Sequence, residues 1–366
     1  MKRPFLLCRV LGAVFIAAVE LLLLSVGPIS CSMAGSDDSA LSFRVASPGS
    51  TGGAALKVQS SSPPVLRSFL VDSSSGMTLE FDKLVSITDA SLCPSDGGTP
   101  VSVSCDEGEG GMSVRLRFSS ETKIGVAYDL KAVAHDADGN TLGFSVSFDG
   151  YNANLPDLVL CEVRNAYSSK ANKYEFVRLY CSKAGNLSGL ELLSAGDGEA
   201  KSFVFPAVEV SEGEYVCVHL RKMKDEDGAW KQQGMTDEDC GDIRASTAVD
   251  SSDGTWDFWQ DNQKSRLSPS DIVMLRNRTD GRVVDAFLFR DPKKEAADWD
   301  GKYASFLKAV EQSGRWLDGE GNVSTEFESA FVAEGITSSA VTRTMRRRKL
   351  DAGPSSAADW CVEKTK

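Results

Sequence analysis

The sequence offers few side chains for catalysis. It contains two histidines, His135 and His219, and histidine is the side chain whose ordinary pKa suits acid–base work near neutral pH. Neither has a catalytic motif around it, and the chain has no Gly-x-Ser-x-Gly, phosphate-binding loop or dinucleotide fingerprint. We therefore expect a protein that is not an enzyme, with no catalytic residue and no cofactor.

Metal ligands in a recognisable spacing are also missing. There is no Cys-x-x-Cys pair and little histidine, so we expect no structural zinc site. The run DADGN at residues 136–140 begins like a calcium loop, but position 12 of such a loop must be Glu and is Ser147 here. We interpret it as a turn. Clustered carboxylates in residues 221–265 could bind Ca²⁺ or form a solvated acidic loop.

Three tryptophans of that acidic segment are candidates for an interaction surface. They are Trp230, Trp256 and Trp259. If exposed, their rings offer contact area for a protein or a carbohydrate. If buried, they hold a long loop in place, and the sequence leaves both alternatives open.

A basic run stands out near the C-terminus of an acidic chain. Arg346, Arg347 and Arg348 are candidates for contact with an anion. The alternatives are pairing inside the molecule and simple solvation.

The cysteines do not form an obvious disulfide framework. Setting Cys8 and Cys31 aside leaves seven of the nine, an odd number, so at least one is free or pairs with another chain. Cys93 and Cys105 lie in one loop region, so a local bridge between them is one alternative. We expect those in apolar strand patterns to be small buried hydrophobic residues; they are Cys161, Cys181 and Cys217.

The N-terminus has the pattern of an export signal. Two basic residues precede an apolar stretch over residues 11–26, and a Ser/Gly-rich segment follows Cys31. With its cysteine, this pattern resembles a bacterial lipoprotein signal. The resemblance implies that residues 1–30 are removed and that Cys31 is lipidated as the first mature residue. Plain secretion after cleavage near Ala34 and an uncleaved anchor are the alternatives.

The charge balance restricts the partners. The formal net charge is −12 at pH 7, whereas nucleic acids are bound by basic surfaces, so no nucleic-acid partner is expected. A lipid anchor would make a membrane the first partner, on the extracytoplasmic side of a bacterial cell envelope. A further protein or carbohydrate ligand is expected but not identified.

Short alternating strands are expected over residues 65–152, after a flexible Ser/Gly-rich tether at 31–64. The stretch MSVRLRF at 112–118 alternates apolar and polar side chains, as a strand with one buried face does. The turn at 136–140 separates two further strands. This spacing of strands and turns predicts a β-sandwich.

The last hairpin of this region carries a family pattern. The residues that match it are Tyr128, Leu130, Val133, Asp138, Gly139 and Asn140. In these positions the region resembles the bacterial Ig-like modules of cell-surface proteins. The resemblance implies a spacer or an adhesion unit.

A second β pattern runs from residue 157 to the C-terminus. In the stretch 267–289, two apolar runs at 272–275 and 283–289 flank a connector with Asp-Gly at 280–281. Because Asp-Gly favours the positive-φ turn that joins twisted strands, this stretch predicts a β-hairpin.

Several motifs of this second region occur in a family order. They lie at residues 160–163, 175–181, 187–192, 205–218 and 267–285, with Arg343 and the stretch 357–360 near the end. In this order they resemble the lamin-tail domain, an Ig-like β-sandwich. Arg178 and Cys181 stand where that family has Glu and Asn, which implies a changed polar network there.

Two segments are interpreted as insertions into the second sandwich, residues 221–265 and 290–340. The stretch 302–317 repeats apolar residues at i, i+3, i+4 and i+7 from Tyr303, which predicts a helix with one buried face.

The expected fold class is mainly β, with two Ig-like β-sandwiches in tandem and short helical insertions in the C-terminal one. The expected function is that of a lipid-anchored extracytoplasmic binding or scaffold protein without catalytic activity. The alternatives are an accessory or degenerate member of a secreted hydrolase system associated with a nuclease or phosphatase, and a purely structural envelope protein.

Overall fold

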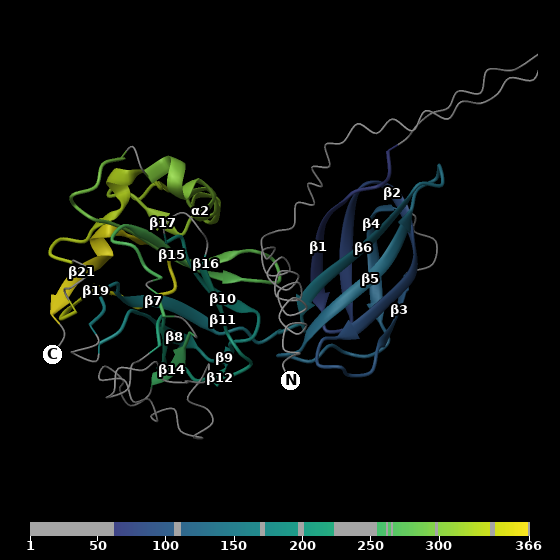
Figure 1. Cartoon of the computed structure of the whole chain (residues 1–366), viewed down its shortest axis with the longest axis horizontal. Coiled ribbons are helices and arrows are strands. Elements are labelled where there is room, and N and C mark those ends of the chain that lie inside the picture. Colours follow the sequence, from purple (N-terminus) through teal and green to yellow (C-terminus); the bar gives the residue numbers. More distant parts are fainter. Residues whose placement is uncertain are drawn as a thin grey trace, which may run out of the picture. The chain divides into compact units, whose positions relative to one another are not determined.

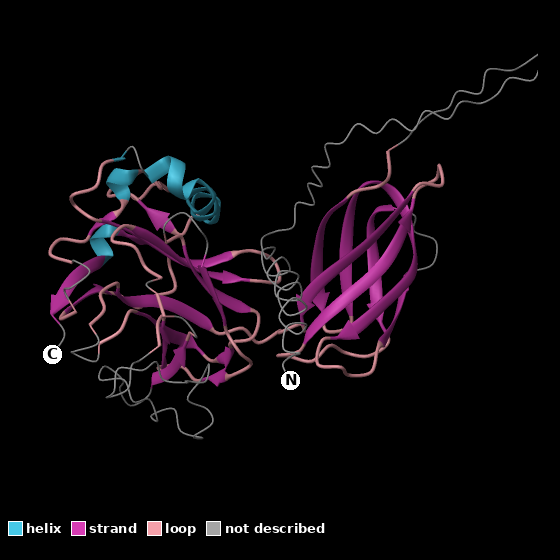
Figure 2. Cartoon of the chain, in the orientation of Figure 1, coloured by secondary structure: helices cyan, strands magenta, loops and turns pink. Residues whose placement is uncertain are grey.

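The computed structural model describes residues 62–105, 111–168, 173–196, 201–222, 255–260, 263–264, 266–296, 299–336 and 341–364. Within these ranges the fold is mainly β with one α-helix (Figure 2). The chain divides into two units, of which the second comprises residues 122–126 and the chain from residue 149 onward. None of the helices in this described part is long and apolar enough to span a membrane.

Six strands build the first unit (Figure 1). They are β1 (Leu66–Ser73), β2 (Gly76–Pro94), β3 (Val101–Cys105), β4 (Gly111–Phe118), β5 (Ala127–His135) and β6 (Thr141–Asp149). Their order is β3-β4-β2-β5-β6, and β1 pairs with β2. The first part of β2 pairs with β1 and β4, and its last part pairs with β5 and β3. This strand of 19 residues therefore belongs to both layers of the sandwich.

Irregularities in β2 allow it to change layers. The register shifts between Glu80 and Val85 against β4, and between Thr88 and Ser91 against β5. Asp89, inside the second shift, has a positive φ of 51°. Extra residues of this kind bend a strand and increase its twist.

The alternation expected in the first unit is present. Val114, Leu116 and Phe118 of β4 are buried, while the intervening arginines are exposed. The expected turn after His135 is confirmed, with Gly139 at a φ of 84°. Asp136 accepts hydrogen bonds from the side-chain amide of Asn140 and from backbone N–H groups within that turn, and these hydrogen bonds lower the pKa of its carboxyl.

The second unit contains two large sheets. The β7 sheet has the order β14-β13-β8-β7-β19-β21, and the β15 sheet has the order β11-β10-β15-β16-β18. Their strands are β7 (Asp157–Arg164), β8 (Phe176–Lys183), β10 (Leu190–Ser194), β11 (Lys201–Val204), β13 (Tyr215–His219), β14 (Thr255–Trp259), β15 (Asp271–Asn277), β16 (Val283–Arg290), β18 (Phe331–Val332), β19 (Arg343–Arg347) and β21 (Trp360–Lys364). Two short pairs join β9 (Gly185–Asn186) with β12 (Glu209–Val210) and β17 (Trp316–Leu317) with β20 (Ser355–Ser356).

The predicted hairpin is the centre of the β15 sheet. β15 and β16 pair antiparallel, with Ile272 opposite Leu288. Gly281 in the connector has a φ of 71°, the conformation for which an Asp-Gly turn was expected.

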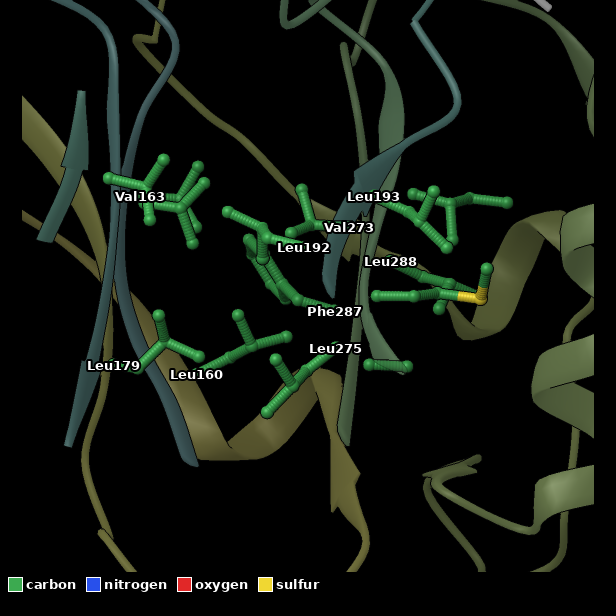
Figure 3. Packing of buried hydrophobic residues seen from close by; sticks show 14 of the residues in the cluster. Leu160, Val163, Leu179, Leu192, Leu193, Val273, Leu275, Phe287 and Leu288 are labelled. Atoms are coloured by element: carbon green, nitrogen blue, oxygen red, sulfur yellow. The ribbon is translucent and has the colours of Figure 1, made fainter. Parts of the chain in front are cut away.

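Apolar side chains of the two sheets meet in one core (Figure 3). Leu160 and Leu179 from the β7 sheet face Leu275 and Phe287 from the β15 sheet. Leu288 points to the opposite side of the β15 sheet. Strands β15 and β16 are consequently buried on both faces.

A helix covers that second face. Helix α2 (Trp299–Ser313) packs against β15 and β16. Gly314 follows its last residue, and the φ of 65° at this glycine suits the position after a helix terminus. The buried side chains of α2 include Tyr303, Phe306, Leu307 and Val310, so the predicted apolar face is confirmed. Burying a large apolar side chain stabilises a fold by roughly 1.5–3 kcal/mol.

Candidate functional site

A cleft of about 480 Å³ opens beside the first turn of α2. Its volume lies within the range of about 300–1,000 Å³ that is usual for small-ligand sites. Ser268 and Ser270 line it from the segment before β15, and Lys302 and Tyr303 line it from α2. Phe327 contributes from the 3₁₀ helix η4 (Phe327–Ser329).

Hydrogen bonds to the backbone fix the aromatic side chains of this cleft. The Tyr303 hydroxyl donates to the carbonyl oxygen of Ser270 at 2.7 Å, and the Trp299 indole N–H donates to the carbonyl oxygen of Thr325 at 3.0 Å. The Trp299 ring meets the Phe327 ring edge-on, with centroids 5.8 Å apart. The polar atoms of these rings are used inside the protein, so the rings supply a rigid, largely apolar floor.

Charged side chains lie around that floor. Lys294, Lys302 and Glu295 line the cleft and are exposed. The Lys302 ammonium lies 5.1 Å from the centre of the Tyr303 ring. Two ammonium groups against one carboxylate make the local balance positive in a chain that is acidic overall.

A buried carboxylate holds the wall of the cleft that precedes β15. Asp271 accepts hydrogen bonds from the backbone N–H groups of Gly196, Ile272 and Ser268, at 2.8, 2.8 and 2.9 Å. Burial raises the pKa of Asp271 to about 7, and the three N–H donors oppose that shift. The carboxyl therefore positions the segment that carries Ser268 and Ser270.

A second group of reactive side chains lies on the outer face of the β7 sheet, the face turned away from the β15 sheet. Cys217 and His219 are two residues apart on β13, so their side chains share a face. Asp257 lies opposite Cys217 on the parallel neighbour β14. His219 Nε2 and Asp257 Oδ1 are 2.6 Å apart, and one ligand atom from each of the three residues lies within 4.8 Å of the others.

Aromatic rings enclose this group. The His219 ring stacks on Trp259 with centroids 3.9 Å apart and planes 11° from parallel. Phe176 approaches the imidazole edge-on at 6.1 Å. Cys217 and His219 are fully buried and Asp257 is 2% exposed, so the group is closed to a substrate, unlike the cleft beside α2.

The tryptophans do not form the expected surface. Trp259 is 2% exposed and belongs to the buried stack, so the expectation of an interaction surface is wrong for this residue. Trp256 is half-buried, packs against the core and donates its indole N–H to Glu214 at 3.1 Å. For both, the alternative of holding the chain in place applies. Trp230 lies outside the described residues.

The basic run is used largely inside the molecule. Arg347 is buried, and its guanidinium lies 2.9 Å from Asp285, so the expected anion contact is wrong for this residue. Arg346 is exposed and pairs with Glu363 at 3.1 Å. Arg348 is exposed and donates to a backbone carbonyl at 2.8 Å. Internal pairing, one of the alternatives, therefore describes the run best.

The bridge considered between Cys93 and Cys105 is not formed, because neither cysteine is in a disulfide. Cys93 lies on the part of β2 that faces β5, whereas Cys105 pairs with β4. The expectation of buried thiols is confirmed for Cys161, Cys181 and Cys217.

Several expectations fall outside the described residues. They concern the signal at 1–30, Cys31, most of the tether and the acidic carboxylates of 223–254 considered for Ca²⁺.

The sequence shows no catalytic motif around His219, and no pattern in it singles out Asp257. The pattern Cys-Val-His carries a usable signal, since residues i and i+2 of a strand share a face. Asp257 comes 38 residues after His219, and only the parallel pairing of β13 with β14 brings it close. His135, the other histidine, lies 2.8 Å from the Thr88 hydroxyl at the surface of the first unit.

Fold and site define a mainly β protein of two units, in which the second unit carries the cleft and the buried reactive group. The chain belongs to the family described as "TP_1001_2nd: protein second domain", which matches residues 156–362.

One relative is an uncharacterized protein of Treponema pallidum (strain Nichols), 28% identical over 178 residues. The match covers 48% of this chain and 42% of the relative, so this chain spans less than half of that protein's length.

Solved structures show only distant likeness. A DUF4876 family protein from Bacteroides thetaiotaomicron is 10% identical over 78% of this chain and 90% of its own, with a TM-score of 0.24. The S-layer protein rSbsC is 13% identical over 59% of this chain and 39% of its own, with a TM-score of 0.22. Scores this low carry no argument about this chain.

Proposed function

We propose that the chain is a lipid-anchored extracytoplasmic binding protein without catalytic activity. Residues 65–152 act as an Ig-like spacer, and residues 157–366 form a lamin-tail-like domain that binds its ligand. The observation that carries the proposal is the cleft beside α2, which combines a fixed aromatic floor with exposed lysines.

The chemistry of the cleft favours a carbohydrate that bears an acidic group. The half-buried Phe327 ring can contact the apolar face of a sugar, with the buried Trp299 and Tyr303 holding the floor beneath it. The ammonium groups of Lys294 and Lys302 attract a carboxylate or sulfate. Both lysines are exposed. A peptide ligand is the alternative outcome of the test.

Gly301 offers a way to fill the cleft without disturbing the fold. It lies on α2, lines the cleft, and a Cβ added there meets no atom within 4 Å. Gly301→Trp should therefore keep the fold and occupy the site. Gly319→Trp is the matched control, because Gly319 is equally unobstructed but does not line the cleft.

The test is binding of the three proteins to an array of acidic and neutral glycans. We expect the wild type and Gly319→Trp to bind acidic glycans, and Gly301→Trp to bind them about tenfold or more weakly. Equal binding by Gly301→Trp, a preference for neutral glycans, or no glycan binding at all would contradict the proposed ligand class.

The anchor needs a separate test. Wild type and Cys31→Ser are expressed in a diderm host and labelled with a palmitate analogue. We expect the variant to lose both the label and its membrane fractionation. If both persist without Cys31, the lipoprotein assignment is wrong and another mode of anchoring or secretion replaces it.

A further inference from the structure

The buried group on the β7 sheet brings together a thiol, an imidazole and a carboxylate. Cys217 and His219 come from one strand and Asp257 from its parallel neighbour, so two adjacent strands hold all three. Strands of a sheet hold side chains more rigidly than loops do, which favours a defined coordination geometry.

One atom of this group lacks a hydrogen-bond partner. His219 is fully buried, and its Nδ1 has no partner in the described part of the chain, whereas Nε2 points at Asp257. Buried ring nitrogens are normally satisfied. Nε2, held beside the Asp257 carboxylate, is the ring nitrogen that can bind a metal, and Nδ1 then carries the ring proton.

We propose that Cys217, His219 and Asp257 bind one divalent transition-metal ion of the Zn²⁺ class. Tetrahedral zinc with bonds of about 2.0–2.3 Å places its ligand atoms roughly 3.3–3.6 Å apart. The three ligand atoms here lie within 4.8 Å of one another, so small side-chain rotations suffice. Sulfur excludes Ca²⁺ and Mg²⁺, which prefer oxygen ligands.

Charge and protons balance in this site. The ion takes the place of the one proton held between His219 Nε2 and Asp257 Oδ1, while Nδ1 carries the ring's own proton, and it displaces the Cys217 thiol proton; both displaced protons pass to solvent. A thiolate and a carboxylate then neutralise the two positive charges, with a neutral imidazole as third ligand. Water can occupy the fourth tetrahedral position.

The neighbouring rings set the geometry. Trp259 stacks on the imidazole at 3.9 Å and Phe176 flanks it at 6.1 Å, so the ring cannot easily turn away from Asp257. These two residues are positioning residues for the proposed site. The absence of a Cys-x-x-Cys motif does not weigh against it, since the third ligand arrives through strand pairing.

The test uses the full-length protein, stripped with a chelator and titrated with Co²⁺. We expect one equivalent to bind with a thiolate-to-cobalt charge-transfer band, which Zn²⁺ then abolishes. Cys217→Ala should remove the band and weaken Zn²⁺ binding about 100-fold or more, since even outer ligands contribute about 10–100-fold. Cys181→Ala is the matched control, because Cys181 is a buried thiol on the same sheet that faces the core.

Asp257→Asn should keep the band and weaken binding. X-ray absorption of the Zn²⁺-loaded wild type should show one sulfur ligand, and this readout does not depend on any variant folding. Binding of no metal, a ligand set with no sulfur or several, or a band that survives Cys217→Ala would overturn the proposal. Neither the glycan result nor the lipidation result bears on it.

Discussion

The two units of the chain bury different kinds of side chain. In the described residues, every buried polar or charged side chain belongs to the second unit. Strands of the first unit alternate buried and exposed residues, as β4 and β5 do. Strands such as β7 and β15 of the second unit are buried along almost their whole length.

This difference in buried polar side chains suggests different roles for the two units: the first serves as a scaffold, and the second can hold binding sites. A sheet with one solvent-exposed face has to bury only the apolar side chains of its other face. A sheet covered on both faces must satisfy its polar groups internally, and such networks hold side chains in fixed positions. The cleft and the group around His219 both lie in the second unit, where those networks are.

The largest expected contrast concerns thiol reactivity. Burial raises the pKa of Cys161 from 9.0 to about 12 and that of Cys181 to about 11, whereas Cys93 of the first unit is exposed. Three pKa units leave about 1,000-fold less thiolate at Cys161. Alkylation of the native protein, read by peptide mass spectrometry, should therefore modify Cys93 long before Cys161 and Cys181. All should react in denaturant, and similar native rates would contradict the contrast.

The next largest effect is expected from the buried ion pair. Arg347→Ala leaves the carboxylate of Asp285 buried without its 2.9 Å partner, which should lower the free energy of unfolding by about 3–5 kcal/mol. The sequence of the first unit contains no tryptophan, so urea unfolding followed by tryptophan fluorescence does not report on that unit and follows the rest of the chain.

The matched variant in the first unit is Arg115→Ala. Arg115 lies 3.1 Å from Asp72, and its side chain is half exposed, so its loss should cost less than about 1 kcal/mol by circular dichroism. Equal losses from Arg115→Ala and Arg347→Ala would remove the distinction between the units.

Asp271→Asn tests the carboxyl beside the cleft. Its pKa is 3.8 ordinarily and about 7 in the fold, so the folded protein holds this proton to higher pH. The stability that this group contributes below about pH 4 is thus lost as pH rises towards 7. From about pH 4 to about pH 7, the free energy of unfolding of the wild type should fall by about 2–4 kcal/mol relative to that of the variant. Urea unfolding at pH 4 to 7 measures this, and parallel profiles would show that the carboxyl titrates normally.

The smallest effects are expected at open glycines. Gly301 on α2 and Gly143 on β6 both have free space around an added Cβ. Gly→Ala at each should raise the free energy of unfolding by about 0.5–1 kcal/mol, because the unfolded chain loses freedom. A clear loss at either position, measured by thermal unfolding, would mean that the surface there is less open than the structure indicates.

Local periodicity explains what the sequence could predict. The alternation of β4, the Asp-Gly hairpin of β15 and β16 and the apolar face of α2 depend on neighbours within a few residues. The burial of Trp259 and Arg347 depends on partners from distant strands, which no local pattern contains. Cys93 and Cys105 illustrate the same limit, since Cys93 lies opposite Asp129 of β5 whereas Cys105 lies opposite Leu116 of β4.

The candidate site was the least predictable part. Serines, lysines and rings that line the cleft come from three segments between residues 268 and 327, and none of them carries a motif. The group around His219 could not be predicted for a similar reason: Asp257 is distant in sequence and is brought beside Cys217 only by the parallel pairing of β13 with β14.

The most direct test of the central claim, that ligand binding belongs to the second unit, is hydrogen exchange on the full chain. Exchange is followed by mass spectrometry with and without the acidic glycan that binds most strongly on the array. We predict protection in residues 266–271 and 294–303, which flank the cleft, and none in residues 62–121 and 127–148 of the first unit. Protection in the first unit without protection beside α2 would contradict the account.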